Sequence, residues 1–193
     1  MKKSFAVLLL AATSLVSAIG LAHADDAHVA PVTEYVQANI VPWLNDPVII
    51  DAIKAQNAEH AGLGEGDIDA LDKTWRAGVD GGDTSLIDKV LANPVSEFLR
   101  AKQAESDGAI AEVFVMDDKG LNVGQSDITS DYWQGDEAKF QKSFGAGKDV
   151  IFVDEIEKDE SSQTLQSQAS VTISDEAGTP IGAVTVGINL DAL

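Results

Sequence analysis

Apolar residues between positions 32 and 105 recur at the three- and four-residue spacing of helices that bury one face. Val48, Ile49 and Ile53 form such a stripe, and the Asp46-Pro47 pair before it is typical of a helix start. The same spacing predicts further helices, and Asn-Pro or Gly marks several of their ends. We predict five helices, which begin near residues 32, 47, 68, 84 and 94.

Near Asp107 the hydrophobic period changes to the alternation of β-strands. Turn residues at 117–120 and 174–178 join two hairpins. We predict strands at 110–116, 121–125, 150–153, 164–173 and 181–190, a short helix at 138–144, and an acidic connector at 154–160. The chain should therefore have an α+β fold, in which N-terminal helices (25–107) pack on an antiparallel sheet (108–193) and form one structural unit with it.

The last two predicted strands have two different faces. In 164–173 an apolar set alternates with a polar set that includes Gln166 and Gln168. In 181–190 branched apolar residues alternate with small or polar ones. The apolar face can pack on the helices. The polar face suits either solvent or the floor of a ligand cavity, and the pattern alone favours neither.

The first 24 residues resemble a secretory signal peptide. Lys2 and Lys3 precede an apolar stretch, and Ala22-His23-Ala24 has the A-x-A form of a cleavage site. We expect cleavage after Ala24 and a mature protein in a bacterial periplasm. The alternative is an uncleaved membrane anchor. No later segment is long and apolar enough to insert in a membrane, so the cleaved protein should not enter the bilayer directly.

The net charge narrows the range of partners. The chain has 13 Lys and Arg against 32 Asp and Glu, a net charge of −19, and loss of Lys2 and Lys3 would make it −21. Such acidity disfavours binding to nucleic acids or anionic membranes, because both require a basic surface. The absence of cysteine excludes disulfides, thiol catalysis and cysteine-rich zinc sites.

Three segments in order resemble the periplasmic PAS-like sensor domains that are also called Cache or PDC domains. FVMDDKGLNVGQSD (114–127) is similar to the first hairpin of that family, SDYWQGDEAKFQKSF (130–144) to its following loop and short helix, and VTISDEAGTPIGAVTVGINLDAL (171–193) to its closing hairpin. NDPVIIDAIKAQN (45–57) is similar to the helical lead-in. The resemblance implies ligand binding and signal transduction. We expect a free-standing soluble version that passes its signal to a membrane partner, such as a sensor kinase or chemoreceptor.

The loop after the first hairpin contains the richest candidate site: Asp131, Tyr132, Trp133, Asp136 and Glu137. Aromatic faces beside carboxylates suit an ammonium group, and in the resembling family this loop borders the ligand cavity. Gln166 and Gln168 could complete the site with neutral hydrogen bonds. The expected ligand is a small polar or zwitterionic metabolite: an amino acid, an amine or a small carboxylate. The alternative is that Tyr132 and Trp133 only anchor the loop, and that the protein is a structural or partner-binding domain.

Other chemistry has less support. The acidic segment 154–160 lacks the spacing of a calcium loop, and a solvated edge explains it better. The sequence contains neither an H-E-x-x-H nor a G-x-S-x-G motif, and His28 and His60 are the only histidines after the signal. We therefore expect no cofactor and no enzymatic activity, with a hydrolase as the least favoured alternative.

Overall fold

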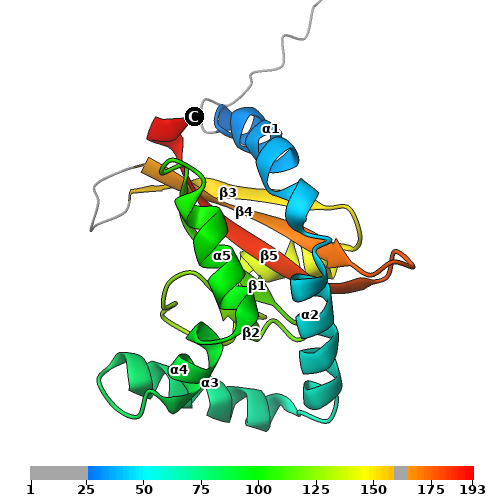
Figure 1. Cartoon of the computed structure of the whole chain (residues 1–193), viewed down its shortest axis with the longest axis vertical. Coiled ribbons are helices and arrows are strands. Elements are labelled where there is room, and N and C mark those ends of the chain that lie inside the picture. The colour runs from blue at the N-terminus through cyan, green and yellow to red at the C-terminus, as the bar shows by residue number, and fades with distance from the viewer. Residues whose placement is uncertain (1–25, 159–164) are drawn as a thin grey trace, which may run out of the picture.

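The centre of the protein is a five-stranded antiparallel sheet (Figure 1). A computed structural model describes residues 26–158 and 165–193. The strand order is β2-β1-β5-β4-β3, so β2 and β3 form the two edges. The strands are β1 (Ile110–Met116), β2 (Asn122–Gln125), β3 (Ile151–Lys158), β4 (Leu165–Ser174) and β5 (Pro180–Asn189).

Helices cover one face of this sheet and extend beyond one of its edges. Helix α1 contacts β3 and β4, α2 contacts β5 and β2, and α5 contacts β1 and β2. Figure 1 shows α3 and α4 beyond the β2 edge. The α-helices are α1 (Val29–Asn39), α2 (Pro47–His60), α3 (Glu65–Val79), α4 (Ser85–Leu91), α5 (Pro94–Ala104) and α6 (Ala138–Gln141), with short 3-10 turns at Val41–Trp43, Phe144–Ala146 and Leu190–Ala192.

Two predicted helix starts have the caps that their sequences indicate. The Asp46 carboxylate accepts a hydrogen bond from the backbone N–H of Val48 at 2.9 Å. The Asn93 side chain accepts one from the N–H of Ser96 at 2.8 Å and donates to the carbonyl of Val123 in β2 at 2.7 Å. Because Asn93 bonds both its own helix and the edge strand, it holds α5 in register with the sheet.

The two faces of the sheet are buried in different ways. Branched residues such as Val184, Val186 and Ile188 face the helices and form the main core. On the opposite face, Phe114, Met116 and Ala183 pack under Phe140 of α6. Polar residues of that face are buried as well: the hydroxyls of Ser170 and Thr185 bond each other at 2.9 Å. The face that the sequence assigned to solvent or to a ligand is therefore covered by the segment around α6.

The predicted α+β class and antiparallel sheet are confirmed, with one correction to the strands. Strand β3 does not end at Val153; it continues to Lys158 through residues predicted to be a connector. Ile156, Glu157 and Lys158 pair with Ser167, Gln166 and Leu165 of β4, after a bulge. Pairing with β4 forms this part of the strand, because a tertiary partner overrides the weak strand propensity of acidic residues.

The predicted signal peptide, residues 1–24, lies outside the described residues. Within the described ranges, no helix combines the length and the apolar character needed to cross a membrane.

Candidate functional site

The predicted ligand loop is held on α3 by one buried carboxylate. Oδ1 of Asp72 accepts hydrogen bonds from the backbone N–H groups of Tyr132 (2.9 Å) and Trp133 (3.1 Å). Oδ2 of Asp72 accepts from Nε of Arg76 at 2.6 Å. One side chain thus satisfies two backbone donors that would otherwise lack partners. Asp72 fixes the position of the loop relative to the helices.

The two aromatic residues of the loop are anchors. Tyr132 is buried and stacks on Trp75 of α3, with ring centroids 5.3 Å apart and planes inclined by 19°. Burial raises the pKa of the Tyr132 phenol far above its ordinary value, and the nearby carboxylates of Asp117 and Glu59 raise it further. The indole N–H of Trp133 donates to the carbonyl of Lys119 at 2.8 Å. This arrangement matches the alternative that these aromatic rings fasten the loop.

Asp131 lies at the contact between the loop and α3. Its Oδ2 accepts from Nη2 of Arg76 at 3.1 Å, and its Oδ1 accepts from the amide of Gln134 at 2.5 Å and from the hydroxyl of Ser130 at 3.3 Å. The residue is 9% exposed. A carboxylate that is nearly buried yet paired with only one cation retains lone pairs for another donor.

Two buried amide side chains bond Asp131, and a third, Gln125, bonds one of them. Nδ2 of Asn122 donates to Oε1 of Gln125 (3.1 Å), to Oγ1 of Thr129 (2.9 Å) and to the backbone carbonyl of Asp131 (3.3 Å). Nε2 of Gln134 donates to that same carbonyl at 3.2 Å. A carbonyl oxygen only accepts, so these bonds determine which end of the Asn122 and Gln134 amides is the nitrogen. We call this group of Asn122, Gln125, Asp131 and Gln134 the Asp131 cluster.

Each amide of the Asp131 cluster keeps one buried atom without a partner. Among the described residues, Oδ1 of Asn122, Nε2 of Gln125 and Oε1 of Gln134 have no hydrogen-bond partner, and all three side chains are at most 1% exposed. A buried polar atom without a partner costs free energy, so such atoms are rare in folded proteins. The cluster therefore offers two acceptors and one donor to a further group.

Charged residues lie beside the cluster. Asp136 is exposed, and its charge raises the pKa values of both Arg76 and Glu137, which places it nearby. Burial raises the pKa of the Glu137 carboxyl, although the ion pair with Lys139 at 3.0 Å acts in the opposite direction. The surroundings of the cluster are thus mainly anionic.

Gln166 and Gln168 do not join this site. The register places Asn122, Met116, Ala183 and Thr172 in one row across the sheet. Gln168 lies four residues from Thr172 along β4, and β4 is three strands away from β2. At about 3.4 Å per residue and about 4.8 Å per strand, Gln168 is roughly 20 Å from Asn122. Gln168 instead donates to Glu112 at 2.8 Å, and both glutamines line a small pocket with acidic residues of β3. The prediction that they complete the Asp131 site is wrong.

Asn122, Gln125 and Gln134 are the members of the region that sequence reasoning missed. Arg76, four residues after Asp72, is interpreted from the sequence as part of a surface pair, with a role in closing the pocket as the less favoured alternative. In the described part of the chain, no group of three or more His, Asp or Glu side chains could hold a metal ion. This result covers residues 154–158 of the acidic segment, whereas residues 159 and 160 are not among the described residues.

Comparison with known proteins gives similarity in structure only. No protein-family model and no curated protein matches the sequence. The solved structures that match include the sensor domain of the histidine kinase DctB from V. cholerae (14% identity, 86% of this chain and 51% of that chain, TM-score 0.47). A second is the E. coli DcuS sensor domain (15% identity, 65% of this chain and 88% of that chain, TM-score 0.37). A third is the ligand-binding domain of the P. aeruginosa PAO1 amino acid chemoreceptor PctC in complex with GABA (15% identity, 85% of this chain and 61% of that chain, TM-score 0.36).

These matches are sensor domains of histidine kinases and chemoreceptors, and the likeness is one of fold. The chain spans about half the length of the DctB sensor domain.

Proposed function

We propose that this protein is a periplasmic sensor-type module that binds a small polar or zwitterionic metabolite at the Asp131 cluster. The observation that supports the proposal is a chain of three buried amides beside a nearly buried carboxylate: Gln134 bonds the Asp131 carboxylate, Asn122 bonds the Asp131 backbone and Gln125, and each amide has one atom unsatisfied. A structural network normally satisfies all of its members, whereas a binding site leaves groups for its ligand.

The chemistry of the unsatisfied atoms indicates what the ligand should offer. Oδ1 of Asn122, Oε1 of Gln134 and the Asp131 carboxylate accept hydrogen bonds, while Nε2 of Gln125 donates one. An ammonium group supplies several donors, and a carboxylate or hydroxyl supplies the acceptor for Gln125. The net charge of −19 disfavours a ligand that is purely anionic. An amino acid or a small hydroxylated amine fits this description best.

The loop residues have separate roles in this proposal. Asp131 provides the anionic contact, and Asp136 remains a candidate contact at the rim. Tyr132 and Trp133 hold the loop in place through Trp75 and Lys119, so they act on the ligand only through the position of Asp131. The signal would pass to a membrane-bound kinase or chemoreceptor, as the PAS-like resemblance implies.

The proposal is tested by comparing the effect of a substitution on ligand binding with its effect on the stability of the ligand-free protein. Gln125→Leu removes Nε2, a buried donor without a partner in the described chain, and also Oε1, which accepts from Asn122 and Thr129; the ligand-free protein should therefore lose about 1 kcal/mol of stability, whereas ligand binding should be lost. Gln168→Leu, at the other end of the sheet, is the matched control and should retain the ligand. Native mass spectrometry of the mature protein, purified without denaturation, detects a bound small molecule. Loss of stability in Gln125→Leu without loss of a ligand would indicate a structural network instead.

A further inference from the structure

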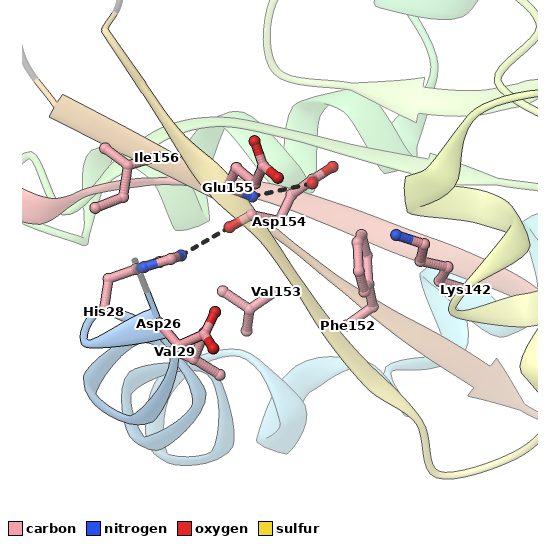
Figure 2. Close-up of a pocket in the computed structure, with 9 residues that line it drawn as sticks. All are labelled: Asp26, His28, Val29, Lys142, Phe152, Val153, Asp154, Glu155 and Ile156. Atoms are coloured by element: carbon pink, nitrogen blue, oxygen red, sulfur yellow. Dashed lines mark hydrogen bonds between the residues drawn. The ribbon is translucent and has the colours of Figure 1, made fainter. Parts of the chain in front are cut away.

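Strand β3 is an open edge of the sheet, on the side opposite to β2 and the Asp131 cluster. The first turn of α1 lies against one face of this edge, and Lys142, which directly follows α6, lies on the other. Between them is a pocket of about 560 Å³ (Figure 2). Its lining consists of Asp26, His28, Val29, Lys142 and residues 152–156 of β3. The pocket therefore follows the exposed backbone of the edge strand.

The backbone of β3 offers hydrogen bonds along this edge. The N–H of Thr172 donates to the carbonyl of Val150 at 3.2 Å, and Phe152 is opposite Ser170. Because bonded and non-bonded pairs alternate in an antiparallel ladder, the N–H and C=O groups of Ile151 and Val153 point away from β4. No other strand of the described chain lies on that side. These four groups form a short template for an added strand.

The side chains around the template favour a cationic partner. Asp26, Asp154 and Glu155 line the pocket with carboxylates. Among the described residues of the lining, Lys142 is the one cation, and its ammonium group already lies 4.7 Å from the centre of the Phe152 ring. The pocket thus combines an apolar surface at Phe152 with an excess of negative charge. Electrostatic complementarity of this kind selects a basic partner.

His28 provides an independent indication that a hydrogen-bond donor belongs here. Its Nε2 bonds the carbonyl of Asp154 at 2.8 Å, and a carbonyl only accepts, so Nε2 holds the proton. The neutral ring then has an acceptor at Nδ1, which is buried and has no partner among the described residues. The residue is 9% exposed and lines the pocket. An N–H group of a bound partner would satisfy this atom.

We propose that the open edge of β3 binds an extended, lysine- or arginine-containing segment of a partner protein as an added strand. The backbone groups of Ile151 and Val153 pair with the segment, and the carboxylates of Asp154 and Glu155 attract its basic side chains. Addition of a strand to a sheet edge is a general mode of peptide recognition.

The same features limit the choice of partner. A second copy of this chain would bring its own Glu155 and Glu157 against those of the first, and the like charges would repel. The bulge between Val153 and Ile156 interrupts the ladder, so only a short segment can pair in register. The partner is therefore a short basic strand of a different protein.

Three blocked eight-residue peptides test this proposal by calorimetric titration of the mature protein. The first alternates lysine and valine. The second has the same sequence with an N-methyl group on every residue, so it has the same charge but no backbone N–H to donate along either edge. The third replaces lysine by glutamate. The first peptide should bind, and the other two should not. Amide exchange of Ile151 and Val153, measured by NMR, should become slower when the first peptide is bound.

Protein variants separate this site from general charge attraction. Glu155→Lys should weaken binding of the lysine–valine peptide about fivefold, the scale of an exposed ion pair. Glu97→Lys makes the same charge change on α5, which packs on β1 and β2 near the opposite edge of the sheet, and should leave the affinity for the peptide unchanged. Equal binding of the N-methylated peptide or of free lysine would overturn the proposal, because either would show that charge alone is recognised. Absence of binding by the first peptide would overturn it as well.

Discussion

Replacement of Asp72 by alanine should release the 126–137 loop from α3. The carboxylate accepts bonds from the N–H groups of Tyr132 and Trp133 and from the guanidinium of Arg76. Loss of the acceptor leaves the N–H of buried Tyr132 and the N–H of half-buried Trp133 without a partner. Each unsatisfied N–H costs about 1–3 kcal/mol of folding free energy, and the N–H of Trp133 is at the low end of this range. The ion pair adds little, about 0–1 kcal/mol, because 53% of the Arg76 side chain is exposed. We expect a loss of about 3 kcal/mol in the free energy of unfolding.

Asp69→Ala is the matched control for this experiment. It removes the same residue type from the same helix, where the carboxylate bonds only the exposed Lys73 at 2.6 Å. Its effect should stay within about 0.5 kcal/mol, as is usual for exposed pairs. Urea denaturation followed by circular dichroism measures the free energy of unfolding. The reasoning fails if the two variants differ by less than about 1 kcal/mol, because the backbone bonds to Asp72 would then contribute little.

Four further outcomes follow from the structure. Burial raises the pKa of Glu137 in the folded protein above its ordinary value of 4.5. The contribution of the neutral carboxyl to stability is therefore fully present below pH 4.5 and is lost as the pH rises through the pKa of the folded state. Glu137→Gln should flatten the pH profile of thermal stability in this range. Gly182→Ala should destabilise by about 2–3 kcal/mol in urea denaturation, because its Cβ would collide with the carbonyl of Met116, whereas Gly66→Ala, in open space on α3, should not destabilise. Intact mass of protein from the periplasmic fraction should show cleavage after Ala24; a chain beginning with Met1 would contradict export by a cleaved signal. Gln168→Ala should leave ligand affinity unchanged in calorimetry.

Most of the fold was predictable because local rules determine it. The Asp46 and Asn93 caps, the change of period near Asp107 and the turn residues of the hairpins all act within a few residues of the chain. The exception is the second half of β3. Residues 154–158 have a poor strand composition, and they form a strand because β4 provides a partner from a segment that follows in the chain. No local pattern indicates that pairing.

The candidate site was predictable only in part. Asp131 was found because it lies beside aromatic residues, but the roles of those residues depend on Asp72, about sixty positions earlier. Asn122 and Gln125 are three residues apart and would face opposite sides of a short strand, so the sequence pattern does not bring them together. They are buried because the segment after β2 folds back, where the N–H of Asn122 donates to the carbonyl of Tyr132 at 3.0 Å. Long-range folding of this kind leaves no periodic signal in the sequence.

The error over Gln166 and Gln168 has the same origin. They share the polar face of the sheet with Ser170 and Thr185, so alternation alone suggests one common cavity. Alternation gives the face of a residue but not its position along the face. The strand register supplies that position and places the two glutamines near the β3 edge.

Calorimetric titration of wild type and Asp131→Asn with a panel of amino acids, amines and carboxylates tests the central claim most directly. Both proteins are first unfolded, freed of small molecules and refolded. The account predicts that wild type binds a zwitterion or an amine, and that Asp131→Asn loses about 2–5 kcal/mol of binding free energy, the range for removal of one partner of a buried charged contact. The ligand-free variant should melt at a lower temperature, because the new amide cannot accept from both Arg76 and Gln134; binding is therefore compared at a temperature at which both proteins are folded. Equal affinity of both proteins, or binding of plain carboxylates only, would contradict the claim that Asp131 recognises the ligand.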